Sequence, residues 1–201
     1  MRVESGVISL VETVRSLALN VRDAAERWLH PRRRRAAMER LRRFGLPESL
    51  LFVCKGNVCR SPYAAGAFQK LCTARIGRML RIDSAGFAGP GRASPPTAVA
   101  AAAARGLDLS AHRSRPLTAG RVNAASLVIV MDGEQASAVR RRFGVPDDRI
   151  VYLGDLDSAP IERREIEDPM DKPRSVFDAV YARIDRCLEA WLSALFEHGP
   201  R

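Results

Sequence analysis

Aromatic residues, cysteines and long apolar runs are all scarce in this sequence, and each scarcity excludes a class of protein. Only 6% of the 201 residues are aromatic, so there are few rings for the base stacking on which single-strand binders rely. The four cysteines form neither a dense disulfide framework nor paired zinc knuckles. No apolar run approaches the roughly 20 residues of a membrane-spanning helix. We therefore expect a soluble globular protein with no nucleic-acid partner and no metal site.

The charge is strongly positive, because 33 lysines and arginines stand against 23 acidic residues and give a formal net charge of +10. Without interleaved aromatic residues, this excess indicates a general affinity for anions rather than for nucleic acid. The chain does not begin with a secretory signal pattern, since Glu4 and Glu12 interrupt the apolar residues there. Together with the few cysteines, this predicts a reducing, cytoplasmic location.

Residues 1–49 differ from the rest and are predicted to form a basic amphipathic helical extension to a domain at residues 50–201. They contain eleven arginines, no lysine and six acidic residues. Pro31 is predicted to end a first helix, and a second short helix should end at Gly45. The apolar positions of the first helix recur every three or four residues: Val7, Leu10, Val11, Val14, Leu17, Ala18, Val21, Ala25 and Trp28. Such a face can pack on its own domain, form a homodimer, or contact an anionic membrane surface or acidic partner.

From residue 50 onward, short apolar strands alternate with helices. Strands are expected at 50–54, 80–84, 127–131 and 150–153, and helices at 62–76, 97–105, 134–143 and 175–196. This alternation predicts an α/β fold, a doubly wound four-stranded parallel sheet with helices on both faces. Ligands of such sheets bind beyond the carboxyl ends of the strands, which is where the segment after residue 54 begins.

The segment that follows the first predicted strand has the composition of an anion site. Gly56 and Asn57 readily adopt positive φ, so the backbone can curl with its N–H groups pointing inward. Ser61 followed by Pro62 predicts a helix N-cap and first turn, and the positive end of that helix would face the curled backbone. We expect an anion to bind here.

Cys54 and Arg60 are the residues of this segment that could take part in a reaction. A cysteine beside a helix N-terminus and a guanidinium is favoured as the thiolate, which makes it a nucleophile at neutral pH. The paired donors of Arg60 suit two phosphate oxygens, and these contacts strengthen as charge redistributes in the transition state. On its own, Cys54 would be interpreted as a small buried side chain and Arg60 as a surface charge. Together, between a strand and a helix, they predict a nucleophile with its oxyanion cradle.

The stretch V-C-K-G-N-V-C-R-S-P at residues 53–62 resembles the signature loop of the low-molecular-weight protein tyrosine phosphatases, whose pattern is C-x5-R-S with G-N inside it. The resemblance extends from residue 50 to about residue 195. It implies that Cys54 attacks phosphorus to give a cysteinyl-phosphate and that Arg60 binds the phosphoryl oxygens. It also implies that Asn57 holds the loop and that Ser61 steadies the thiolate.

The other residues of the loop are expected to help bind the substrate: Lys55, Gly56, Val58 and Cys59. Family members that resemble arginine phosphatases have threonine where this chain has Val58, so the loop looks more like the tyrosine-specific kind. Cys59 allows two interpretations. It could form a reversible disulfide that protects Cys54 from overoxidation, or it could simply pack behind the loop.

The resemblance also implies a general acid on an Asp-Pro loop late in the chain, and Asp168 fits this position. Such a carboxyl protonates the leaving oxygen and then takes a proton from the hydrolytic water, with no cofactor or metal. Many family members have an aromatic residue after Asp-Pro, whereas this chain has Met170. We expect Met170 and Phe87 to form the wall beside the substrate ring. His112 is predicted to be structural rather than a base.

The predicted function is therefore removal of phosphate from phosphotyrosine in proteins. Bacterial relatives of this kind often oppose tyrosine kinases of polysaccharide export, which makes such a kinase the candidate partner. One alternative is an arsenate reductase that uses an external thiol, since no cysteine pair follows Cys72 before Cys187 to act as an internal relay. Another is a phosphoprotein-binding module without turnover, with the N-terminal helix as its interaction surface.

Overall fold

The computed structural model describes residues 3–77 and 79–196, and within the first helix it leaves undescribed the side chains of residues 3–20 and 22. The four predicted strands and the helices after residue 50 are confirmed to within two residues at most of their ends, and one short helix, α4, was not predicted. In chain order the elements are α1 (Val3–Phe44), β1 (Ser49–Cys54), α2 (Arg60–Ile76), β2 (Arg81–Gly86), α3 (Pro96–Ala103), α4 (Ala119–Ala124), β3 (Leu127–Val130), α5 (Gly133–Phe143), the 3-10 turn η1 (Asp147–Arg149), β4 (Ile150–Tyr152), the 3-10 turn η2 (Leu153–Leu156) and α6 (Arg174–Phe196).

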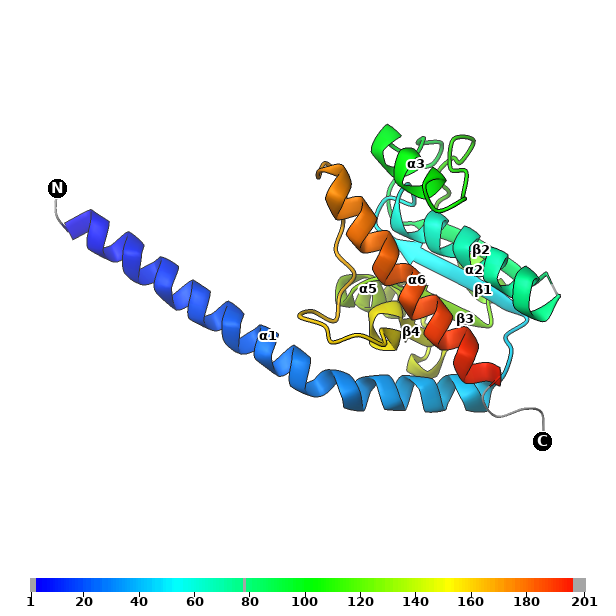
Figure 1. The fold of residues 1–201 in the computed structure, drawn as a ribbon, viewed down its shortest axis with the longest axis horizontal. Helices are drawn as coiled ribbons and strands as arrows, with labels where there is room; N and C mark the ends of the chain where they lie inside the picture. Colours follow the sequence, from blue (N-terminus) through cyan, green and yellow to red (C-terminus); the bar gives the residue numbers. More distant parts are fainter. Residues whose placement is uncertain (1–2, 78, 197–201) are drawn as a thin grey trace.

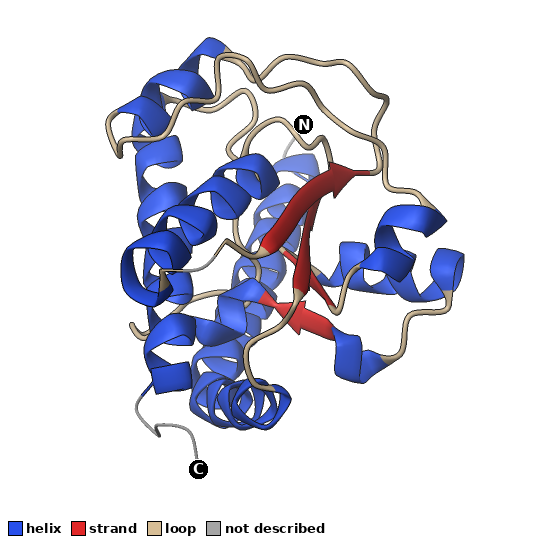
Figure 2. Cartoon of the chain, turned by 90° about the vertical axis from the view of Figure 1, so that its right-hand side faces the viewer, coloured by secondary structure: helices blue, strands red, loops and turns tan. Residues whose placement is uncertain are grey.

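The four strands form one parallel sheet in the order β2-β1-β3-β4. All six residues of β1 are buried, as expected for a central strand that is covered on both faces. Leu50 and Phe52 face a core made with α2, α3, α6 and the end of α1, whereas Leu51 and Val53 face a smaller core made with α4 and α5. Figure 2 shows the helices on both sides of the strands. The predicted doubly wound α/β fold is confirmed.

Helix α1 corrects one prediction, because Pro31 lies inside it and does not end it. Proline removes one backbone hydrogen bond and crowds the preceding turn, which bends a helix without necessarily stopping it. Figure 1 shows that α1 changes direction along its length. The turns after Pro31 are held by tertiary packing, since Ala37, Met38 and Leu41 are buried in the larger core.

The second part of α1 is fastened to the domain by polar contacts as well. Arg40 donates to the carbonyl oxygens of Asp147 (3.0 Å) and Ile150 (2.7 Å), so it closes the end of the sheet near β4. His30 Nε2 lies 3.0 Å from the carbonyl oxygen of Asp157. The predicted division at residue 49 therefore separates two regions of different composition that share one core.

The first part of α1 extends away from the domain (Figure 1). Of its predicted apolar face, residues 7–18 lie outside the described side chains. Val21 and Trp28 are both 65% exposed, so this part of the face does not pack on its own domain. Among the described residues, no helix combines the length and the apolar character needed to cross a bilayer.

Candidate active site

The Cys54 thiol lies at the carboxyl end of β1 and receives hydrogen bonds from the start of the next loop. Its Sγ accepts from the backbone N–H of Asn57 at 3.2 Å and lies 3.0 Å from Ser61 Oγ. Donors directed at sulfur stabilise the thiolate over the thiol. Ser61 is not the N-cap that the sequence suggested, because α2 already begins at Arg60 after Cys59. Its hydroxyl group does not cap the helix and can instead form a hydrogen bond with the Cys54 sulfur.

Asn57 connects the loop to two neighbouring segments. Its backbone adopts φ +50°, and its side chain is fully buried. Its Nδ2 donates to Ser61 Oγ and to Ser84 Oγ, both at 2.9 Å, and its Oδ1 accepts from the backbone N–H of Arg115 at 2.8 Å. Because Nδ2 can only donate, Ser61 Oγ accepts from it and can give its own proton to Cys54. Of the predicted positive-φ pair, Asn57 has that conformation and Gly56 does not.

Two residues outside the loop also fix its shape. His112 Nε2 lies 2.8 Å from the carbonyl oxygen of Asn57, in keeping with the structural role predicted for this histidine. At Gly86, the end of β2, a Cβ atom would lie 2.8 Å from the backbone nitrogen of Asn57 and 3.0 Å from the carbonyl oxygen of Cys54. Only glycine fits there without displacing the loop.

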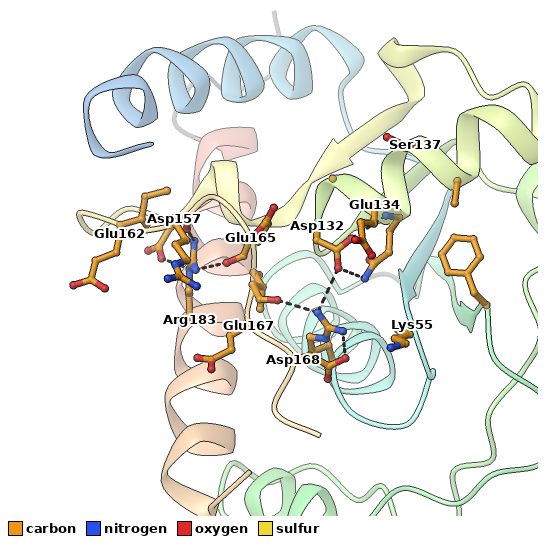
Figure 3. A pocket seen from close by; sticks show the side chains of 18 of the residues that line it. Lys55, Asp132, Glu134, Ser137, Asp157, Glu162, Glu165, Glu167, Asp168 and Arg183 are labelled. Atoms are coloured by element: carbon orange, nitrogen blue, oxygen red, sulfur yellow. Dashed lines mark hydrogen bonds and ion pairs between the residues drawn. The ribbon is translucent and has the colours of Figure 1, made fainter. Parts of the chain in front are cut away.

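Arg60 joins the loop to the segment that carries Asp168. It is 3% exposed, and its Nη1 donates to the carbonyl oxygen of Ile166 at 2.9 Å. Its Nη2 lies 2.5 Å from Asp168 Oδ2, and Nη1 lies 3.7 Å from Asp132 Oδ2. Asp132 and Asp168, which are labelled in Figure 3, are the two carboxylates that form ion pairs with this guanidinium. Arg60 and Asp168, two predicted catalytic residues that are 108 positions apart in the sequence, are thus brought together.

A cavity of about 1180 Å³ opens beside these groups (Figure 3). Lys55, Arg60, Phe87 and Asp168 line it, as predicted for site residues. Phe87 also stacks under Arg142, whose Cζ lies 5.4 Å from the ring centroid. Further charged residues that the sequence analysis missed line the same cavity: Asp132, Glu134, Glu162, Glu165, Glu167, Arg163 and Arg183. Asp132 could have been suspected from its place directly after a buried strand.

Three predicted substrate-binding residues, Met170, Val58 and Cys59, are not among those that line this cavity; Val58 and Cys59 are buried, and Met170 is partly buried. Met170 packs against the larger core, and its backbone N–H donates to Asp168 Oδ1 at 3.3 Å. This contact helps to orient the carboxyl group, and of the two residues predicted for the wall, Phe87 lines the cavity; a wall role for Met170 stays a prediction. Val58 and Cys59 are 2% and 3% exposed, so only their backbone can face a bound phosphate.

All four cysteines are buried and free. Burial and the neighbouring Cys54 raise the pKa of the Cys59 thiol to about 12, which makes it a poor nucleophile in this conformation. This favours the packing interpretation of Cys59, while its role as a redox partner stays a prediction. Burial also raises the pKa of Cys72 to about 11 and raises that of Cys187, which disfavours both as internal electron relays.

Comparisons with known proteins agree with this geometry. The family model described as low molecular weight phosphotyrosine protein phosphatase matches residues 49–200. The chain is 32% identical to the probable low molecular weight protein-tyrosine-phosphatase EpsP of Ralstonia solanacearum, over 72% of this chain and 94% of that protein.

Two solved structures extend the comparison to the fold. The tyrosine phosphatase AmsI of Erwinia amylovora has a TM-score of 0.65 and 30% identity, covering 75% of this chain and 95% of that one. The YwlE arginine phosphatase of Geobacillus stearothermophilus has a TM-score of 0.64 and 25% identity, and the match covers 77% of this chain and 99% of that one. With the family model spanning the loop, the sheet and the Asp168 segment, this chain belongs to the low-molecular-weight protein-tyrosine-phosphatase family.

Proposed function

We propose that this protein hydrolyses phosphotyrosine in proteins through a covalent intermediate on Cys54. The observation that carries the proposal is the relay of hydrogen bonds from Asn57 through Ser61 to the Cys54 sulfur at the base of a helix. It supports a stabilised thiolate at the point where the helix N-terminus and Arg60 would attract a phosphate. Family membership supports the same chemistry.

The first step would transfer the phosphoryl group to the enzyme. The Cys54 thiolate attacks phosphorus, an S–P bond forms, and the bond from phosphorus to the tyrosine oxygen breaks. Asp168 gives its proton to that oxygen, because a phenolate leaves poorly without one. Arg60 holds two phosphoryl oxygens and stabilises the charge that spreads over them.

The second step would release phosphate. Water attacks phosphorus while Asp168, now ionised, takes a proton from it, and Cys54 leaves as the thiolate. The contact between Arg60 and Asp168 bears on the order of events. A phosphate dianion competes with Asp168 for Arg60 Nη2, so substrate binding releases the carboxyl group from the guanidinium. The released carboxyl group can then turn toward the leaving oxygen.

The substrate preference rests on the walls of the cavity. Phe87 offers an apolar ring face beside Lys55, which suits an aromatic phosphate ester better than an alkyl one. Val58 favours the tyrosine-specific kind of loop over the arginine phosphatases. A tyrosine-phosphorylated protein is the proposed partner, with a bacterial tyrosine kinase of polysaccharide export as the candidate and the cytoplasm as the compartment.

Hydrolysis of para-nitrophenyl phosphate in the presence of a metal chelator tests the proposal. The wild type should turn over, Cys54→Ser should be inactive, and Asp168→Asn should lose about 10²- to 10⁴-fold in kcat, the usual contribution of a general acid. Circular dichroism and phosphate binding by Cys54→Ser control for folding. A folded wild type that binds phosphate without turnover would instead favour the binding module, and arsenate reduction with added thiol would then be measured.

A further inference from the structure

A second cavity, of about 990 Å³, lies between the later part of α1 and the later part of α6. We call it the α1–α6 groove. Met38, Ala190 and Ala194 provide apolar surface along it. A groove of this size with mixed walls is more suitable for a peptide segment than for a single small ion.

The α1–α6 groove is strongly basic. Its described lining includes six arginines and one acidic residue, Glu189: the arginines are Arg27, Arg34, Arg35, Arg42, Arg75 and Arg186. Low-dielectric walls with charge of one sign focus the potential and attract ligands of the opposite sign. Arginine also offers paired donors that match the oxygens of phosphate. The groove therefore favours a phosphate-bearing ligand.

Two buried polar atoms among its lining residues have no hydrogen-bond partner in the described part of the chain. His30 is 6% exposed, and its Nδ1 is unpaired, as is Nε of Arg34. Since His30 Nε2 lies 3.0 Å from a carbonyl oxygen, which can only accept, Nε2 carries a proton. Buried polar atoms usually have partners. An oxygen of a bound anion would supply one for the Arg34 Nε–H, whereas His30 Nδ1 would accept from a hydroxyl group of the ligand.

The α1–α6 groove adjoins the cavity of the candidate active site. Pro160, Ile161 and Arg186 line both. The guanidinium of Arg186 donates two hydrogen bonds of 3.1 Å to the carboxylate of Asp157, so this shared wall is rigid. A peptide bound at Cys54 can therefore continue past Pro160 and Ile161 into the groove.

We propose that the α1–α6 groove binds a second phosphorylated residue on the same substrate chain as the phosphotyrosine. The proposal rests on the proposed function, since it assigns the substrate class of that site as multiply phosphorylated protein segments. The charge, the unpaired buried Nε–H of Arg34 and the shared wall favour this ligand. A membrane surface fits less well, because the groove is recessed between two helices.

The test compares pairs of peptides that each carry one phosphotyrosine, with or without a phosphoserine three to eight residues away. For the best spacing, the second phosphate should raise kcat/KM of the wild type about five- to tenfold, as two solvent-exposed arginine contacts would. No gain at any spacing would overturn the proposal. Using phosphoserine keeps a single hydrolysable tyrosine ester in each peptide.

The decisive variant is Arg27→Ala/Arg35→Ala, which removes two exposed arginines of the groove from one helix. Its matched control, Arg32→Ala/Arg43→Ala, removes the same charge from exposed positions of the same helix outside the groove lining. Alanine preserves the helix in both. The ratio of kcat/KM between the paired peptides should fall to near one in the first variant and stay at the wild-type value in the control. An equal fall of this ratio in both variants would refute the binding of the second phosphate in the α1–α6 groove.

Binding measurements separate this proposal from the proposed function. If the wild type has no turnover, the proposed function fails, and fluorescence anisotropy of the paired peptides on Cys54→Ser still tests the groove. The doubly phosphorylated peptide should bind more tightly, and adding Arg27→Ala/Arg35→Ala should remove the difference. If that pair instead reduces only the binding of phosphatidylglycerol vesicles, the groove is a headgroup site and the proposal is wrong.

Discussion

The loop at residues 54–61 and helix α1 are held in place in opposite ways. In the loop, the side chains of Asn57 and Ser61 are fully buried and hydrogen-bonded to one another. Helix α1 is anchored near one end by Leu41 and its neighbours, while Trp28 is 65% exposed. The loop is thus suited to fixing reacting atoms, and the helix to presenting a surface. Substitutions should therefore change catalysis in one region and stability or binding in the other.

The largest effect on stability is expected where α1 enters the core. Leu41→Ala should lower the free energy of unfolding by about 2 to 5 kcal/mol, because it leaves a cavity beside a side chain that is 1% exposed. Val21→Ala, on the exposed part of the same helix, should change it by less than about 0.5 kcal/mol. Urea denaturation measures both. Similar values for the two variants would mean that α1 is not anchored as described.

Activity provides the second half of this comparison. At a temperature where Leu41→Ala is folded, its kcat on para-nitrophenyl phosphate should equal that of the wild type, because α1 packs against η2 and α6, whereas the hydrogen bonds that support the loop come from Ser84, His112 and Arg115. A large fall in kcat would show that the later part of α1 also positions the catalytic groups.

Gly86 offers a smaller but more local perturbation. Gly86→Ala places a methyl group 2.8 Å from the Asn57 nitrogen, so the loop must shift. We expect about 1 to 3 kcal/mol of destabilisation from this overpacking and, beyond it, a fall in kcat. Gly89→Ala is the matched control, since its Cβ would have no atom within 4 Å among the described residues. Unchanged kcat in a folded Gly86→Ala protein would contradict the view that this contact sets the loop's geometry.

The sequence predicted the loop well because its main chemistry is local. Cys54, Asn57 and Ser61 lie within eight consecutive residues and contact one another directly. The supports of the loop could not be read in this way. Ser84 and Arg115 reach Asn57 from 27 and 58 residues away, and their contacts exist only once β2 lies beside β1.

The error at Pro31 has the same origin, since tertiary packing overrode a local rule. Pro31 normally breaks a helix, yet burial of Met38 and Leu41 supports the turns that follow it. The strand and helix pattern was predictable because apolar periodicity reflects burial directly.

The smallest expected effect is at Cys59, which tests how far burial in the loop lowers the reactivity of a thiol. Burial is the largest cause of the raised Cys59 pKa, about 12 in the wild type, and it persists in Cys54→Ser, so Cys59 should stay a thiol at pH 8 in that variant. It becomes reactive only as the pH rises toward that pKa. In Cys54→Ser, iodoacetamide should therefore leave Cys59 unmodified at pH 8 over times that fully alkylate N-acetylcysteine, as measured by mass spectrometry.

The same burial should govern oxidation. If Cys59 only packs behind the loop, the wild type and Cys59→Ala should lose activity to peroxide at the same rate and regain equal fractions of it with dithiothreitol. A wild type that recovers while Cys59→Ala does not would show that the loop opens far enough to form the disulfide. The tight packing of residues 54–61 would then be one of two states, and the contrast with the exposed part of α1 would hold only for the reduced enzyme.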